Sequence, residues 1–249
     1  MTLRTLGAID GLNLVIVRKA CAYGPYVDYG PITSYMAMAS VYAYLKQPVK
    51  CLWGPGKHPV HTVHVDDVAG AMWACAEWID RVGGRTKANE IAGEEIPFRN
   101  DKSKAAQVPA MAPPDQKIVA PLFHLEDDGN LDLAGLGTRV ANAFGTQLEF
   151  YNFMVNTLAK LEDHVEDINE EHVSTWTTMI TESKPPCPQT HYTAYMTVYN
   201  LKRIVVAFNA DKLKRVVGYQ LKVPQLTPDT VRDVIDKLKA EGSWPNNDS

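Results

Sequence analysis

Three histidines close together in the sequence are the first residues whose types could do chemistry. His58, His61 and His64 are spaced by three residues, and imidazole nitrogens are common metal ligands. The run Val60–Val65 predicts a β-strand, however, and residues three apart on a strand point to opposite faces. Apart from two aspartates that suit helix capping, no carboxylate or cysteine stands at a convincing ligand offset. We therefore expect loop and strand histidines and no metal site.

Other chemistry-bearing patterns have simpler structural interpretations. Gly54-Pro-Gly-Lys57 lacks the Gly-x-x-x-x-Gly-Lys-Ser/Thr spacing that wraps a phosphate, so it predicts a turn. Six carboxylates between Glu162 and Glu171 repeat at three to four residues, which indicates a solvated helix face, with a partner-binding surface as the alternative. Cys187 lies in a proline-rich loop with no neighbouring base, which argues against a nucleophile.

Composition narrows the class of protein. The 249 residues are 45% apolar and 22% charged, which is ordinary for a globular chain. A net charge of -4 gives no basic surplus for nucleic acid or an anionic membrane, and no apolar run approaches the ~18 residues of a membrane span. The start is too short and polar for a secretory signal. Four cysteines without a Cys-x-x-Cys pair fit reduced thiols. We expect a cytoplasmic α/β protein.

The first half of the chain contains the clearest elements. The unbroken apolar run within Leu12–Arg18 predicts a strand buried on both faces, as in a parallel sheet. Its place so near the amino terminus is unusual, because parallel neighbours arrive through crossover helices. A helix is expected over 34–45. A second helix is expected after Asp66 as its N-cap, with an apolar stripe formed by Val68, Ala71, Met72, Cys75 and Ile79.

The second half is less regular. The pattern predicts a strand over 117–123, helices over 131–144, 147–161 and 164–180, and a strand over 203–208. A final helix is expected to begin with Thr227 as its cap and Pro228 in its first turn.

Three stretches together resemble one family. Val15-Ile-Val-Arg-Lys-Ala-Cys-Ala-Tyr-Gly-Pro25 is similar to a strand that ends Arg-Pro-x-Asn-x-Tyr-Gly-Pro. Val63-His-Val-Asp-Asp-Val-Ala69 resembles a His-Val-Asp-Asp-Val-Ala strand-to-helix junction, and Asn209–Tyr219, followed by Pro224, resembles a Lys-x-x-x-x-x-Gly-Tyr-x-Pro signature. In this order and spacing they resemble the later part of extended short-chain dehydrogenases/reductases, the NAD-dependent epimerase/dehydratase family.

This resemblance implies a dinucleotide-binding sheet followed by a substrate-binding part. The family carries a Gly-x-x-Gly-x-x-Gly turn for the pyrophosphate and a Tyr-x-x-x-Lys pair for proton transfer, both before the strand matched by Leu12–Arg18. Neither is found there, and the glycine pattern is absent from all 249 residues. The Tyr42-Ala-Tyr-Leu-Lys46 pattern comes after that strand, so we interpret it as a packed tyrosine and a solvated lysine.

We therefore expect an α/β chain with an incomplete doubly wound, Rossmann-like sheet and a mixed α/β substrate-binding domain. Residues 1–82 would hold the sheet remnant, the Tyr-Gly-Pro loop and the Val-Asp-Asp helix. Residues 83–249 would form the substrate-domain-like region with the carboxy-terminal helix.

The site residues follow from the resemblance alone. Lys19, Ala20 and Cys21 are expected near the NAD or NADP cofactor, and Tyr23 near the substrate. Lys19 replaces a proline and adds a charge and a backbone donor, and Cys21 replaces an asparagine amide. The Asp66-Asp67 pair is expected to be structural. No catalytic residue is assigned.

Three hypotheses remain open for the function. The parent activity would be NAD(P)-dependent oxidation, epimerisation or dehydration at a hydroxyl or keto group of a small molecule. The favoured interpretation is a shortened relative that is inactive as this chain alone. The alternative is a non-catalytic binding subunit that completes its sheet with a partner chain, because an unpaired buried strand invites association, including self-association. The substrate and the choice of NAD or NADP stay open.

Overall fold

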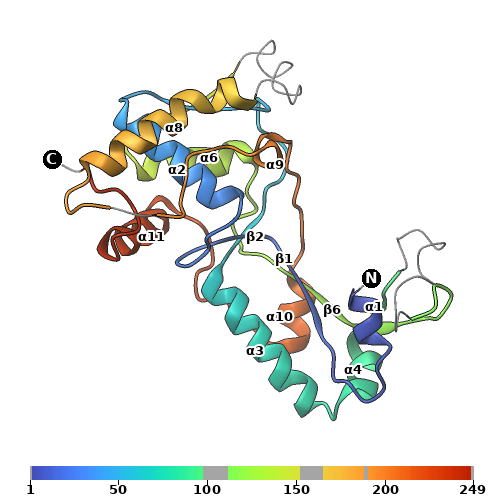
Figure 1. Ribbon diagram of the computed structural model, residues 1–249. Coiled ribbons are helices and arrows are strands. Elements are labelled where there is room, and N and C mark those ends of the chain that lie inside the picture. The colour runs from blue at the N-terminus through green and yellow to red at the C-terminus, as the bar shows by residue number, and fades with distance from the viewer. Residues whose placement is uncertain (1, 98–111, 152–164, 188–189, 248–249) are drawn as a thin grey trace. The chain divides into compact units, whose positions relative to one another are not determined.

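The computed structural model describes residues 2–97, 112–151, 165–187 and 190–247 (Figure 1). Its helices are α1 (Thr2–Gly7), α2 (Pro31–Tyr44), α3 (Val65–Arg81), α4 (Arg85–Ala92), α6 (Leu133–Ala143), α8 (Val165–Glu182), α9 (Val198–Leu201), α10 (Asp211–Val217) and α11 (Pro228–Ala240). Its strands are β1 (Ile16–Lys19), β2 (Cys21–Tyr23), β3 (Val49–Cys51), β4 (Thr62–His64), β5 (Gly93–Glu95), β6 (Val119–Leu125) and β7 (Leu148–Phe150). The expected α/β class is confirmed.

The described strands form three small sheets. One has the order β1-β6-β5, and the others are the pairs β2-β4 and β3-β7. All pairs are parallel except β5 with β6. In the first sheet Ile16 lies opposite Leu122 and Lys19 opposite Leu125. The parallel arrangement predicted from the apolar run before Arg18 is therefore observed, although the strand begins later than expected. The predicted burial on both faces is wrong, because in β1 only Ile16 is buried and Arg18 and Lys19 are exposed.

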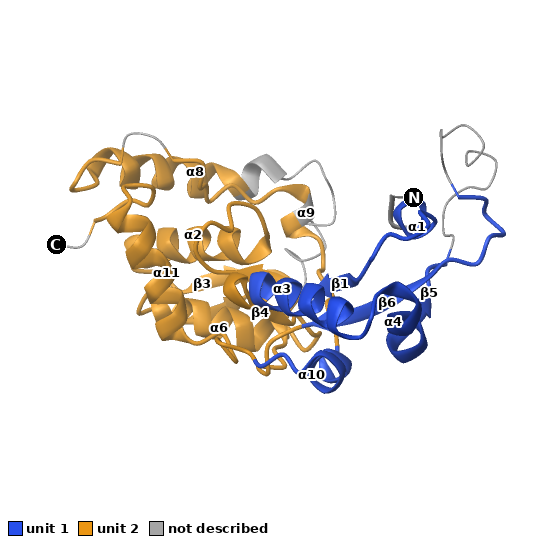
Figure 2. Ribbon diagram, turned by 90° about the horizontal axis from the view of Figure 1, so that it is seen from below, with its two compact units in different colours: residues 1–19, 68–125, 209–220 blue, residues 20–67, 126–208, 221–249 orange. Residues whose placement is uncertain are grey.

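The chain divides into two compact units, each made of three separate segments (Figure 2). Unit 1 contains residues 1–19, 68–125 and 209–220, and unit 2 contains residues 20–67, 126–208 and 221–249. Both units include residues from each side of the boundary that the sequence suggested after residue 82. The chain crosses between the units repeatedly, which local sequence patterns do not reveal.

Unit 1 is built around its mixed sheet. A small buried cluster includes Ile16 and Leu122 on neighbouring strands. On β6 the ring of Phe123 meets that of Trp78 from α3 edge to face, with centroids 5.4 Å apart. Arg4 on α1 is buried, and its guanidinium donates to the Pro113 carbonyl at 2.9 Å. Apolar contact and satisfied polar groups together hold this unit.

Unit 2 has the larger core. Helices α2, α6, α8 and α11 all contribute side chains to one buried cluster. In it Trp244 is almost fully buried and meets the Trp176 ring at 5.0 Å. Helix α11 begins with the expected Thr227 cap, in a reciprocal pair with Thr230. None of the described helices combines the length and the hydropathy that crossing a bilayer requires.

One predicted helix is wrong in its first part. Within the range 147–161, residues Leu148–Phe150 form β7, which pairs in parallel with β3. That pairing joins segments far apart in the sequence, so the local pattern could not indicate it. Residues 152–161 lie outside the described residues. The strand expected over 203–208 is reduced to one isolated bridge between Val206 and Val60.

Candidate functional site

Strands β2 and β4 bring the first two motif stretches together in unit 2. They pair in parallel, with Cys21 opposite Thr62 and Tyr23 opposite His64. At the end of this pair the rings of Tyr23 and His64 meet edge to face, with centroids 5.2 Å apart, a geometry that aromatic rings favour. Two stretches that resemble family motifs in sequence are therefore in direct contact.

The turn after Tyr23 requires glycine. Gly24 has φ of 127°, which side chains rarely adopt. A Cβ atom there would also lie 2.7 Å from Cγ1 of Val65 and 2.9 Å from Nε2 of His64. The Tyr-Gly-Pro loop can approach the start of α3 only because this residue has no side chain.

The two aspartates at the start of α3 have different environments. Asp66 is exposed and Asp67 is fully buried. The Asp67 carboxylate accepts hydrogen bonds from the backbone N–H groups of Lys222 (2.7 Å) and Val223 (3.0 Å). Asp66 is not the predicted N-cap, because α3 already begins at Val65 and the His64 imidazole accepts from the Asp66 N–H at 3.2 Å. Asp67 instead holds the segment that follows the third motif stretch at the start of α3, through these two hydrogen bonds.

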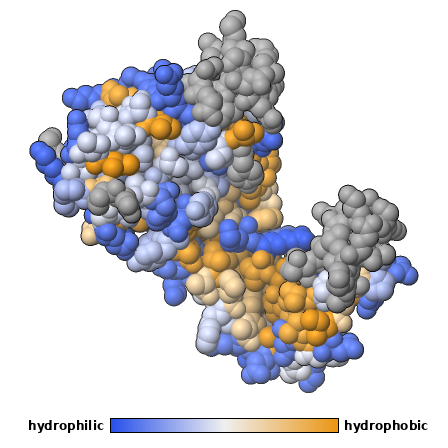
Figure 3. Space-filling view, in the orientation of Figure 1, coloured by the Kyte–Doolittle hydropathy of each residue, from blue (hydrophilic) through white to orange (hydrophobic). Residues whose placement is uncertain are grey.

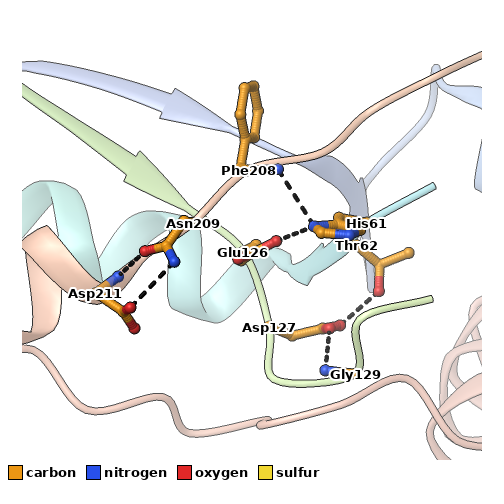
Figure 4. Close-up of polar contacts among 8 residues, drawn as sticks. All are labelled: His61, Thr62, Glu126, Asp127, Gly129, Phe208, Asn209 and Asp211. Atoms are coloured by element: carbon orange, nitrogen blue, oxygen red, sulfur yellow. Dashed lines mark hydrogen bonds and ion pairs between the residues drawn. The ribbon is translucent and has the colours of Figure 1, made fainter. Parts of the chain in front are cut away.

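Within unit 1 the third stretch contacts α3 at Gly70, the residue directly after the second stretch. A Cβ atom at Gly70 on α3 would collide with the hydroxyl group of Tyr219, so the tyrosine packs against the bare helix backbone. At the start of α10 the side chain of Asn209 accepts from the Asp211 N–H at 2.8 Å (Figure 4). The second stretch thus contacts the first directly, and the residue that follows it contacts the third.

A histidine and a glutamate form a nearly buried pair in unit 2. Nδ1 of His61 contacts Oε2 of Glu126, and the Phe208 N–H points at the same nitrogen from 3.2 Å (Figure 4). Their side chains are only 13% and 10% exposed. A carboxylate on one ring nitrogen orients an imidazole, as it does in many catalytic and structural pairs. Sequence reasoning missed Glu126, although its position directly after an apolar strand is the signal that could have indicated it.

Asp127, the next residue, is hydrogen-bonded to Thr62 on β4 within unit 2. Its carboxylate accepts from the Thr62 hydroxyl at 2.5 Å and from the Gly129 N–H at 2.9 Å (Figure 4). Its own N–H donates to the Thr62 carbonyl at 2.8 Å. Burial raises the pKa of Asp127, and these hydrogen bonds oppose that shift. The carboxylate fixes a turn and has almost no exposed surface.

The residues expected at a cofactor and substrate lie on the connection from β1 through β2. Lys19 is exposed at the end of β1, Ala20 is buried, and Cys21 is half-buried in β2. Tyr23 is fully buried, and its burial raises the pKa of its phenol, with the nearby Asp127 carboxylate adding to the shift. The phenol is therefore protonated at neutral pH. Coenzyme contact at residues 19–21 and substrate contact at Tyr23 stay predictions.

The Tyr42–Lys46 pattern is divided between the core and the surface. Tyr42 is buried in α2, with its hydroxyl group 3.1 Å from that of Tyr151 and 3.2 Å from Nε2 of His172. Burial raises the pKa of Tyr42, which opposes a role as a base. Lys46 lies exposed beyond the end of α2. These positions agree with the interpretation as a packed tyrosine and a solvated lysine.

The three histidines are also separated by their contacts. His61 contacts Glu126, while His64 faces Asp66 at 3.6 Å. Burial lowers the pKa of His58 and of His64. In the part of the chain that the structure describes, no three His, Cys, Asp or Glu side chains are grouped as metal ligands would be.

Comparisons with known proteins give weak structural similarities. No family model matches the sequence, and no curated protein matches it. UDP-glucuronic acid 4-epimerase from Bacillus cereus, solved with UDP-glucuronic acid and NAD, has a TM-score of 0.43 and 10% identity, over 92% of this chain and 46% of that one. A mutant of that enzyme gives 0.43 and 11% over the same shares. PbgP3 protein from Burkholderia pseudomallei gives 0.40 and 12%, over 94% and 48%. The chain spans about half the length of these proteins, and TM-scores below 0.5 assign it neither family nor activity.

Proposed function

We propose that this chain is the substrate-binding portion of an NAD(P)-dependent epimerase/dehydratase-type oxidoreductase that acts on a hydroxyl or keto group of a small molecule. One observation carries the proposal. The first stretch contacts the second through Tyr23 and His64. Asp67 of the second stretch binds residues 222–223, just before Pro224, and Gly70, directly after the second stretch, contacts Tyr219 of the third. Chance matches scattered along the chain would have no reason to meet.

The same proposal holds that these 249 residues do not bind the coenzyme by themselves. A pyrophosphate needs closely approaching backbone N–H groups, which the family obtains from a glycine-rich turn at a helix N-terminus. The sequence has no Gly-x-x-Gly-x-x-Gly pattern. Its Tyr-x-x-x-Lys pattern places the phenol of Tyr42 in the core, against Tyr151 and His172. Hydride and proton transfer therefore lack their usual groups in this chain.

Titration of the purified chain with NADH and NADPH, followed by nucleotide fluorescence, tests whether the chain binds the coenzyme by itself. We expect no saturable binding. Binding in the micromolar range would contradict it.

Ligand-observed NMR without coenzyme tests the proposed substrate binding. UDP-glucuronic acid and UDP-glucose serve as hydroxyl-bearing probes. We expect saturation transfer to at least one probe. Failure of both probes on a chain whose circular dichroism shows it folded would contradict substrate binding and leave the coenzyme result unaffected.

A further inference from the structure

A groove in unit 1 runs along the open edge of its sheet. Its volume is about 670 Å³, and one wall is the continuous segment Asn13–Arg18, which includes most of β1. The other wall is α3, through side chains one and two turns apart: Met72, Cys75, Ala76, Ile79 and Asp80. Because six consecutive residues of an extended segment line the groove, backbone as well as side chains forms this wall.

Strand β1 has a neighbour on one side only among the described residues. It is the terminal strand of the order β1-β6-β5, and on its other edge no backbone hydrogen bond joins it to another described residue. An edge strand presents a row of N–H and C=O groups that pair readily with an added strand. The groove therefore offers the hydrogen bonds of a sheet as well as apolar contact.

The helix wall exposes apolar surface that the sequence pattern predicted to be buried. Met72 belongs to the apolar stripe of α3, yet it is 59% exposed, and its neighbour Trp73 is 70% exposed. Cys75 and Ile79, from the same stripe, are buried. Figure 3 shows hydrophobic surface gathered over unit 1. An exposed large apolar side chain such as Met72, beside a strand with one open edge, is typical of an interaction surface.

The charges give the groove a direction. Just after the carboxyl end of α3, the N–H of Arg85 at the start of α4 donates to the Asn13 side chain at 2.9 Å, so α3 runs opposite to β1. Asp80 therefore lies at the Asn13 end of the groove and Arg18 at the other end. Neither side chain forms an ion pair with a described residue. A complementary occupant carries a basic residue at one end and an acidic residue at the other.

We propose that this groove binds an extended segment of another polypeptide, which adds to the sheet as a strand parallel to β1. Its amino end carries a basic residue facing Asp80, its centre is apolar, and its carboxyl end carries an acidic residue facing Arg18. The parallel direction follows from the run of apolar residues Leu14–Val17, which suits a strand with parallel neighbours, and from the existing parallel pair with β6. This site is independent of the proposed substrate binding.

Fluorescence anisotropy with a labelled peptide, Lys-Val-Thr-Ile-Val-Thr-Glu, tests the site on the whole chain. We expect saturable binding. The reversed-charge peptide, with Glu first and Lys last, should bind several-fold more weakly. A peptide with proline for the central isoleucine should not bind, because proline cannot donate to a ladder. Equal binding of all three peptides, or none by the first, would overturn the proposal.

A matched pair of variants locates the binding. Ala76→Arg fills the groove from an exposed helix position and should weaken peptide binding by about tenfold or more. Ala69→Arg makes the same change at an exposed position of α3 outside the groove and should leave binding unchanged. The double variant Arg18→Glu/Asp80→Lys should prefer the reversed-charge peptide. If Ala69→Arg weakens binding as much as Ala76→Arg, the groove is not the site.

Sedimentation equilibrium tests whether a second copy of this chain, and not a separate polypeptide, occupies the groove. A second copy of the chain in the groove would give a concentration-dependent dimer that Ala76→Arg dissociates and Ala69→Arg does not. That result would overturn the assignment to a separate strand. A chain that stays monomeric while binding the peptide supports it.

Discussion

The carboxylate of Asp67 links the start of α3 to the segment that follows the third motif stretch. It is fully buried and accepts two backbone hydrogen bonds from the segment 222–223. Hydrogen bonds to a charged acceptor are stronger than neutral ones, so their loss should weaken the attachment of this segment. Asp67 is therefore a structural residue, whereas its exposed neighbour Asp66 is a surface residue.

Replacement of Asp67 should therefore be much more costly than replacement of its neighbour. We expect Asp67→Ala to lower the free energy of unfolding by about 2–4 kcal/mol, because the buried carboxylate and its two backbone hydrogen bonds are lost. The exposed Asp66→Ala should change it by about 0.5 kcal/mol or less. Urea unfolding followed by circular dichroism measures both. Equal effects of the two variants would contradict the role assigned to Asp67.

The sequence allowed part of this site to be predicted, and single residues show what it could and could not indicate. The Asp66-Asp67 pair was predicted to be structural, but the pattern could not say which aspartate is buried or that its partners lie near residue 222. Glu126 was missed because its contact with His61 joins segments far apart in the chain. Gly24 could be recognised as a turn residue, whereas the close approach of Val65 that excludes a side chain is visible only in the structure.

At the scale of elements, a hydrogen-bonded histidine joins two helices in the core of unit 2. His172 on α8 is buried, and its Nε2 lies 3.2 Å from the hydroxyl group of Tyr42 on α2. Burial lowers the pKa of His172 below its ordinary value near 6.5. Between the lowered pKa and about pH 6.5 the unfolded chain binds more protons than the folded one. The stabilisation is present above about pH 6.5 and is lost as the pH falls through the lowered pKa.

Acidification should therefore destabilise the chain, and His172→Gln should reduce that dependence. Glutamine keeps a donor for Tyr42 but does not titrate in this range. Urea midpoints at about pH 7.5 and 5.5 measure the difference. His58 and His64 also have lowered pKa values, so part of the dependence should remain.

Tyr42→Phe is the matched control. It removes the hydroxyl group that contacts His172 but keeps the buried imidazole, so the pH dependence should persist even if the overall stability falls. A His172→Gln variant with the full dependence of the unaltered chain would show that this histidine does not cause it.

Elements with strong local signals were predictable, and those made by distant pairing were not. The cap at Thr227 and the apolar stripe of the last helix specify α11 from local residues alone. The segment Leu148–Phe150 has no such signal, and it becomes a strand because β3 lies beside it. In α3 the periodicity predicted the helix correctly but also predicted burial of Met72, which depends on whether anything covers that face.

At the scale of the whole chain, the two units differ in the size of the buried apolar core that stabilises each of them. Unit 1 contains a short three-stranded mixed sheet, with β1 and β5 at its two edges among the described residues, and a small cluster around Ile16 and Leu122. Unit 2 has an extensive core shared by four helices. Since local opening requires less free energy where fewer apolar contacts are lost, the strands of unit 1 should exchange amide hydrogens before the helices of unit 2. Sequence patterns did not predict this division, because each unit combines three distant segments.

Two leucine-to-alanine variants test this difference by hydrogen exchange with mass spectrometry. Leu122→Ala removes a buried side chain from β6 in unit 1, and Leu136→Ala removes one from α6 in unit 2. Each should cost about 2–5 kcal/mol because a cavity remains. If the units open separately, Leu122→Ala accelerates exchange in β1, β5 and β6 and leaves α2, α6 and α11 protected. Acceleration of exchange in both units to the same extent would mean that the chain opens as one cooperative body, since a cavity in one core would then weaken every amide alike.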